Sequence, residues 1–167
     1  HHVELAVSDF LLAEESDAPK DPNGQLDMDQ VESIQIADVA QFFAQGDEKV
    51  AAFLGAKLGS HSIWMDDFEA RSSKLPTLAP LPAGAIRIET FNRPQLPWLS
   101  IGSGSISLPT MSPVAGKSMQ WSYSQSPTGV AGLMRPFKKG LLSGMDKLNL
   151  TIASDQGAKL MVQIEDN

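Results

Sequence analysis

Before its midpoint the chain carries the run Ser62-Ile63-Trp64-Met65-Asp66-Asp67-Phe68, which resembles the last strand of a β domain. After its midpoint it carries Ile86-Arg87-Ile88-Glu89-Thr90-Phe91-Asn92, which resembles the first strand of such a domain. The chain begins on a strand-like run, Val3–Phe10, and ends on another, Leu160–Asn167. Joining the end to the beginning gives one continuous β domain. The order therefore predicts one sandwich in circularly permuted order, or two half-domains.

Short runs of alternating apolar and polar residues recur along the chain. In the first of them Val3, Leu5 and Val7 share one face, and a period of two predicts a half-buried strand. Similar runs, separated by Gly, Ser and Pro, span residues 60–68, 86–91, 104–108, 117–124, 130–137, 147–153 and 159–165. Many short strands at this spacing predict an all-β fold, an antiparallel β-sandwich. Residues 48–58 carry a weak helical pattern.

The length of 167 residues fits one domain. Residues 72–84 carry Pro76, Pro80 and Pro82 among small residues, which predicts an extended linker that joins the two halves of the sequence. We expect a single sandwich over residues 1–167. The alternative divides the chain into residues 1–71, the C-terminal half of one module, and residues 85–167, the N-terminal half of the next. We favour one closed sandwich, because half-sandwiches leave long exposed edges.

Composition narrows the classes of partner. The net charge of −7 and the pI near 4.8 disfavour nucleic acid, because no basic surface is present to neutralise phosphates. The chain has no cysteine, which excludes disulfides, thiol catalysis and cysteine-bound zinc. No stretch approaches the roughly 20 apolar residues of a membrane span. We therefore expect no nucleic-acid partner and no membrane span.

Several strand motifs carry a resemblance to a known group of domains. The motifs are Ile88-Glu89-Thr90-Phe91, Gly116–Tyr123, Met145–Ile152, Ala158–Asp166, Leu5–Phe10 and Ile63-Trp64-Met65-Asp66-Asp67. The residue pattern of these motifs resembles that of the β-sandwich carbohydrate-binding modules of the jelly-roll, galactose-binding-like type, and that of the related complex I intermediate-associated proteins. The order of the motifs matches only after rotation of the sequence, as in a circularly permuted domain.

The resemblance implies binding of a polysaccharide or other glycan, for which aromatic side chains are the usual platform. Trp98 follows Pro97 in a loop, so we expect it to be exposed and to be the main platform. Trp121 and Tyr123 are further ligand-binding candidates, but they alternate in phase with Met119, which favours packing in the core. Trp64 is the remaining candidate ring, and it reads equally well as a core residue.

The resemblance also implies that the first and last strands lie side by side, which brings Glu89 near Asp66 and Asp67. Carboxylate oxygens are the ligands that Ca²⁺ prefers, so these three residues are a candidate for a structural calcium site. Adjacent strand residues point to opposite faces, so Asp66 and Asp67 both reach one ion only if a bulge intervenes.

A catalytic function has little support in the sequence. A serine-hydrolase triad needs a positioned histidine, and the chain offers only His1, His2 and His61. We therefore expect a non-catalytic carbohydrate-binding module, an accessory or cell-surface domain of a bacterial protein, secreted to an extracellular or periplasmic location. The alternatives are a protein-interaction or assembly domain that binds another protein, and a structural module of a multidomain surface protein.

Overall fold

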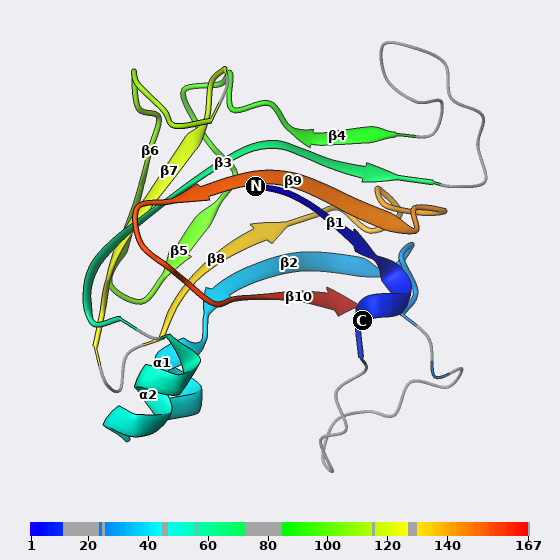
Figure 1. Cartoon of the computed structure of the whole chain (residues 1–167). Coiled ribbons are helices and arrows are strands. Elements are labelled where there is room, and N and C mark those ends of the chain that lie inside the picture. The colour runs from blue at the N-terminus through cyan, green and yellow to red at the C-terminus, as the bar shows by residue number, and fades with distance from the viewer. Residues whose placement is uncertain are drawn as a thin grey trace.

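The structure, a computed structural model, describes residues 1–11, 24, 26–44, 47–55, 57–72, 85–114, 116–126 and 130–166. Two antiparallel sheets pack against each other around one apolar core (Figure 1). This arrangement confirms the predicted all-β sandwich. The jelly-roll type and the permuted order stay predictions. All of the predicted linker except Ser72 lies outside the described residues.

Sheet A contains, from one edge to the other, β1 (His2–Ala6), β9 (Lys147–Ser154), β3 (Gly59–Arg71), β7 (Met119–Gln125) and β6 (Gly104–Ser107). A further strand, β4 (Ile86–Glu89), pairs with β3 beyond the end of the β3–β7 pairing. Sheet B contains β10 (Leu160–Asp166), β2 (Val31–Asp38), β8 (Ala131–Pro136) and β5 (Leu99–Ile101). Three short helices complete the described elements: η1 (Val7–Asp9), α1 (Ala40–Ala44) and α2 (Glu48–Leu54).

Strands from both halves of the sequence meet in both sheets. Strands β1 and β3 join sheet A and β2 joins sheet B, while the later strands complete each of them. The expected adjacency of the two runs on either side of residues 72–84 is confirmed, because Phe68 of β3 is the register partner of Glu89 of β4. The strands at the two ends of the chain, β1 and β10, belong to different sheets, because β1 pairs with β9 and β10 pairs with β2.

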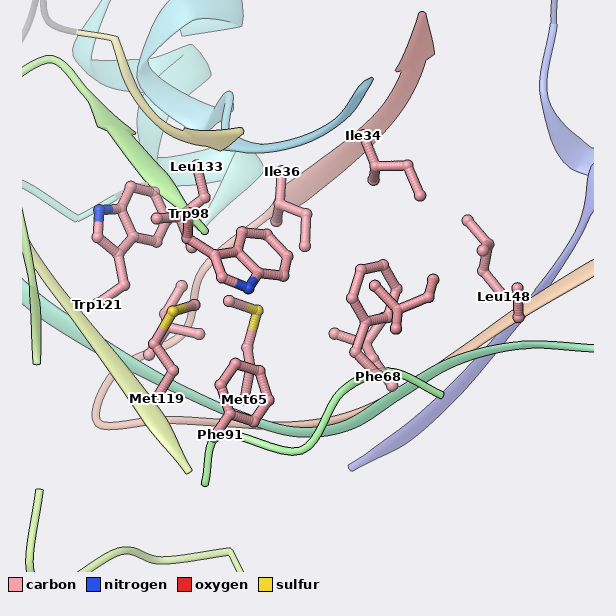
Figure 2. Close-up of a cluster of buried hydrophobic side chains, with 14 of the residues drawn as sticks. Ile34, Ile36, Met65, Phe68, Phe91, Trp98, Met119, Trp121, Leu133 and Leu148 are labelled. Carbon is pink, nitrogen blue, oxygen red and sulfur yellow. The ribbon is translucent and has the colours of Figure 1, made fainter. Parts of the chain in front are cut away.

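The core lies between the inner faces of the two sheets (Figure 2). Sheet B contributes Ile34, Ile36 and Leu133, and each of them is at most 1% exposed. Sheet A contributes large side chains such as Phe68 and Trp121, which are 2% and 0% exposed. Burial of this apolar surface is the main stabilising contribution to the sandwich.

A buried polar cluster joins the two sheets beside the helices. The Tyr123 hydroxyl of β7 donates to Asp38 Oδ2 of β2 at 2.8 Å, and Ala40 N–H at the start of α1 donates to Asp38 Oδ1 at 3.2 Å. Gln125 Nε2 donates to the Asp38 carbonyl at 3.3 Å. Asp38 therefore fixes both the distance between the sheets and the start of the helical segment, which lies at one end of the sandwich (Figure 1).

Two glycines carry the chain from sheet B to sheet A between β5 and β6. Gly102 has a φ of 79°, and a Cβ there would lie 2.1 Å from the Val130 carbonyl oxygen. A Cβ at Gly104 would lie 2.5 Å from Trp121 Nε1. Both positions therefore need glycine, because a side chain would collide with the backbone or with the core.

Candidate functional site

The structure buries all three rings that the sequence suggested as ligand-binding residues. Trp98 is 5% exposed, Trp121 is 0% exposed and Tyr123 is 3% exposed. The expectation that Trp98 is exposed is therefore wrong. Core packing of Trp121 and Tyr123, which their phase with Met119 favoured, is confirmed. None of these three rings presents an open face on which a sugar could stack.

Packing contacts explain the position of these rings. The Trp98 ring lies 5.6 Å from the Phe68 ring, centroid to centroid, and it is one of the labelled core side chains in Figure 2. Trp121 and Tyr123 stack on each other at 4.1 Å, and Trp121 Nε1 donates to Ser100 Oγ at 3.2 Å. Such contacts stabilise buried aromatic pairs beyond their area burial. Tertiary packing therefore overrides the loop position of Trp98.

Of the four candidate rings, Trp64 is the one that faces outward. Its neighbours Ile63 and Met65 are 0% and 1% exposed and point into the core, so the alternation of β3 turns Trp64 to the outer face of sheet A. Its side chain is partly exposed. The same alternation is visible in the sequence. If Ile63 and Met65 are taken as core residues, Trp64 between them has to lie on the outer face of the sheet.

Small polar side chains surround Trp64 on the same outer face. In the registers of β3, β7 and β6, Trp64 lies opposite Gln120, and Gln120 lies opposite Ser107. On the other side of β3, Trp64 lies opposite Ala153 of β9. We call this surface the Trp64 face, and it consists of Ser60, Ser62, Trp64, Ser105, Ser107, Gln120, Ser122, Ser124, Thr151 and Ala153.

The Trp64 face offers hydrogen-bonding groups without charge. Ser62 Oγ and Ser122 Oγ lie 3.3 Å apart, and Gln120 Nε2 donates to Ser122 Oγ at 3.3 Å. Hydroxyl and amide groups both donate and accept, so a row of them can pair with the hydroxyls of a ligand. None of the residues that define the face is charged, and the carboxylate of Asp66 lies at its edge, opposite Thr151. The face therefore combines one aromatic ring with neutral groups that have both donor and acceptor capacity.

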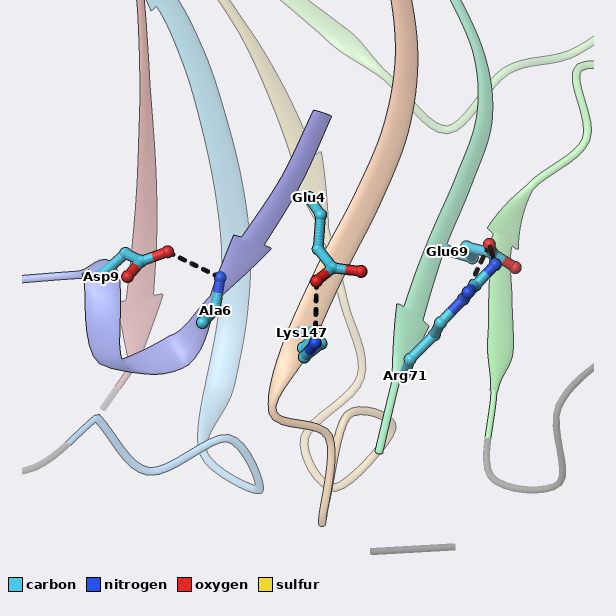
Figure 3. A network of polar contacts seen from close by, with 6 residues as sticks. All are labelled: Glu4, Ala6, Asp9, Glu69, Arg71 and Lys147. Atoms are coloured by element: carbon cyan, nitrogen blue, oxygen red, sulfur yellow. Dashed lines mark hydrogen bonds and ion pairs between the residues drawn. The ribbon is translucent and has the colours of Figure 1, made fainter. Parts of the chain in front are cut away.

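A bulge in β3 divides this outer surface of sheet A into two regions. The β3–β9 register shifts between Asp66 and Glu69, and Asp67 has a φ of 50° within the shift. Beyond the bulge the outward side chains are ionic instead of hydroxylic. Figure 3 shows the pairs of Lys147 with Glu4, at 2.7 Å, and of Arg71 with Glu69. The bulge therefore marks one end of the neutral Trp64 face.

Two of the three carboxylates of the predicted calcium site, Asp66 and Glu89, accept hydrogen bonds from nearby backbone. Glu89 Oε1 accepts from the N–H groups of Thr90 and Phe91 at 3.0 and 3.2 Å. Asp66 Oδ1 accepts from Asp67 N–H at 2.8 Å, and burial raises the pKa of Asp66 above its usual value. Asp67 itself is exposed. The bulge that shared ligation requires is present, and the calcium site stays a prediction.

Two further observations bear on a metal at this place. Within the described residues, no three His, Cys, Asp or Glu side chains come together as a group that could hold a metal ion. Burial lowers the pKa of the Arg135 guanidinium, and the nearby Glu89 carboxylate offsets part of that shift. A neighbouring cation competes with Ca²⁺ for the same carboxylate.

The outer face of sheet B carries one apolar row beside rows that contain Gln35, Gln163 and Glu165. Leu99 and Ile101 of β5 are 54% and 38% exposed, and Met161 of β10 is 40% exposed. The register places Met161, Ala37, Gly132 and Ile101 in one row across all four strands. The two outer surfaces of the sandwich therefore differ in chemistry.

No protein-family model, curated protein or solved structure matches this chain. Its function therefore has to be inferred from the geometry of its surfaces. Among the described residues, no helix has the length and apolar character that crossing a membrane requires.

Proposed function

We propose that this protein is a non-catalytic carbohydrate-binding module that holds a neutral polysaccharide on the Trp64 face. The observation that carries the proposal is the partly exposed ring of Trp64 among outward hydroxyl and amide groups. The C–H faces of a pyranose ring stack on the electron-rich face of an indole. The surrounding Ser and Gln side chains then pair with the sugar hydroxyls.

The proposal includes a cellular role and a metal. The module would serve as an accessory or cell-surface domain of jelly-roll type, at an extracellular or periplasmic location where polysaccharides occur. A structural Ca²⁺ ion would bind at Asp66, Asp67 and Glu89, and it would have to replace the present backbone hydrogen bonds of Asp66 and Glu89. In this proposal the ion supports the bulge at the end of the Trp64 face and does not touch the glycan.

The test is binding of the purified protein to a broad glycan array, with and without calcium. Trp64→Thr removes the ring and keeps a residue that suits a β-strand. We expect it to weaken binding at least about tenfold, which corresponds to about 1.4 kcal/mol. The matched control is Phe53→Ala on α2, which removes a ring that is 87% exposed and lies outside the Trp64 face. Equal binding by wild type and Trp64→Thr, or no binding by folded wild type, would contradict the proposal.

The apolar row on the outer face of sheet B supports a second candidate function, binding of another protein as an interaction or assembly domain. Leu99, Ile101 and Met161 would form the centre of that contact, because exposed apolar patches mark interaction surfaces. Leu99→Gln should then weaken capture of the partner, while Trp64→Thr should leave it unchanged. The opposite result would favour the glycan.

A further inference from the structure

Strand β10 is the longest of the four strands that end the two sheets, and it forms one edge of sheet B (Figure 1). It has seven residues, whereas β1 has five, β6 has four and β5 has three. Natural sheets usually protect an edge with a short strand, a proline, a charge or a bulge. The stretch Leu160–Ile164 of β10 has no proline, no charged residue and no register shift.

The phase of the hydrogen bonds shows which backbone groups of β10 face away from sheet B. Val39 N–H donates to the Lys159 carbonyl at 3.1 Å, so the odd-numbered residues of β10 are the ones that bond to β2. The N–H and C=O groups of Leu160, Val162 and Ile164 therefore point to the free edge. No hydrogen bond joins these groups to another residue in the described part of the chain.

The next longest edge, β1, is closed by the chain itself. Ile152 N–H donates to the His1 carbonyl at 2.7 Å, so the even-numbered residues of β1 face its free edge. The outward N–H of Ala6 donates to Asp9 Oδ2 of η1 at 2.9 Å. The helical turn that follows β1 therefore caps its edge, and β10 keeps the longest open one.

The apolar side chains of β10 are incompletely covered as well. Leu160, Val162 and Ile164 pack against the core, yet each of them is only partly buried. On the neighbouring strand β2, Ile34 and Ile36 are 0% and 1% exposed. A further strand beside β10 would therefore satisfy open backbone groups and cover apolar surface at the same time.

The sequence of β10 is complementary to itself when two copies run antiparallel about Val162. In this register Val162 lies opposite its own copy, and Leu160 lies opposite Ile164 of the second copy. Lys159 lies opposite Glu165 of the second copy at both ends of the contact. Both side chains are exposed, and Lys159 has no ionic partner in the described part of the chain. A shift by two residues in either direction keeps the hydrogen-bond phase but separates Lys159 from Glu165.

We propose that two copies of this protein pair through β10 into a symmetric dimer, in which the two B sheets join into one continuous sheet. Main-chain hydrogen bonds between edge strands provide affinity, and opposite charges across the strands fix the register. The contact uses the same residues of both copies, as a two-fold axis requires. The Trp64 face lies on sheet A, so this inference does not depend on glycan binding.

Sedimentation velocity of the full chain, from about 1 μM to about 1 mM, tests the proposal. The wild type should pass from the chain mass of 18.0 kDa to twice that mass as its concentration rises. Lys159→Glu and Glu165→Lys each place like charges opposite each other at both ends, and each should weaken the dimer at least about tenfold. The two changes together restore opposite charges and should restore the dimer. The double variant also lacks the bond from Ser33 Oγ to Glu165, so a restored dimer reports the charges.

Matched variants separate this contact from general effects. Lys159→Glu makes the net charge of −7 more negative, whereas Glu165→Lys makes it less negative, so general repulsion cannot weaken both dimers. Lys117→Glu makes the same change at an exposed lysine that precedes β7, and it should leave the dimer unchanged. Val162→Pro removes an N–H that faces the free edge, where a sheet tolerates proline, and it should abolish the dimer.

Three results would overturn the proposal. The first is a wild type that stays a monomer up to about 1 mM. The second is a dimer that the single charge variants or a folded Val162→Pro leave unchanged. The third is a double charge variant that does not dimerise again. Thermal melts of each variant distinguish a lost dimer from a lost fold.

Discussion

Replacement of Tyr123 by Phe tests how the two sheets are held together. The variant removes the hydroxyl that donates to Asp38 Oδ2 at 2.8 Å and keeps the ring that stacks on Trp121 at 4.1 Å and on His61 at 5.2 Å. Burial and the neighbouring Asp38 carboxylate raise the pKa of Tyr123, so the phenol stays a neutral donor over the usual pH range. Asp38 is 3% exposed, so its carboxylate is poorly placed to recover the lost bond from water.

The expected loss of stability follows from the charge of the acceptor. A hydrogen bond to an ionised group contributes about 1.5–3 kcal/mol, so Tyr123→Phe should lower the free energy of unfolding by about 2 kcal/mol. With a urea m-value of about 2 kcal/mol/M, the unfolding midpoint falls by about 1 M. At about 2–4 °C per kcal/mol, Tm falls by about 4–8 °C.

The assay is urea unfolding at pH 7, followed by circular dichroism. A double-mutant cycle with Asp38→Asn isolates the coupling of the pair, since the two variants together should cost less than the sum of their separate effects. A loss below about 0.5 kcal/mol for Tyr123→Phe would refute the account, because a desolvated bond to a carboxylate cannot be worth so little.

Three further predictions concern other parts of the sandwich. Phe68→Ala removes a core ring that is 2% exposed and should lower stability by about 3–5 kcal/mol in the same assay; a loss near zero would contradict its place in the core. Lys147→Ala removes an exposed ion pair with Glu4, so it should lower Tm in dilute buffer. In about 1 M salt, where the screening length is about 3 Å, the loss of Tm should be much smaller. A loss of Tm that is the same at both salt concentrations would contradict this reasoning. Burial raises the pKa of Asp66, so the folded state holds this proton more tightly than the unfolded state, and wild-type stability should fall as the pH rises from the ordinary carboxyl range to the raised value. Asp66→Asn should remove that part of the pH dependence, which thermal melts between about pH 3 and 7 would show; an unchanged profile would contradict it.

The sequence was sufficient wherever alternation was clean. The phase of Met119, Trp121 and Tyr123 predicted both a strand and the burial of its rings, and β7 agrees with it. The run at 159–165 predicted β10, which pairs with β2 along its whole length. The alternating pattern was therefore sufficient to predict the fold class, because a period of two indicates a strand with one buried face.

Contacts between segments that are distant in the sequence could not be predicted from local alternation. Strand β5 has three residues, Leu99–Ile101, which is too short to show alternation, and it forms only by pairing with β8. Trp98 was expected on the surface because Pro97 precedes it, yet its ring packs on Phe68 of another segment. Local sequence does not report which rings meet in the core.

In the candidate site, too, one feature could be predicted from the local sequence and another could not. The outward position of Trp64 could have been read from Ile63 and Met65, which frame it on β3. The row from Trp64 to Ser107 could not, because it depends on the registers of β3 with β7 and of β7 with β6. Register is set by the pairing of whole strands, so the composition of this face becomes visible only in the folded chain.

The most direct test of glycan binding at the Trp64 face is an NMR titration of the three tryptophan indole N–H signals with a soluble glycan that the array identifies as a ligand. The Trp64 signal is assigned by its absence from the spectrum of Trp64→Thr. The account predicts that this signal shifts with saturable dependence on ligand concentration, while the signal of Trp121, which is 0% exposed, stays in place. A Trp64 signal that stays fixed while the protein binds a glycan would contradict the account.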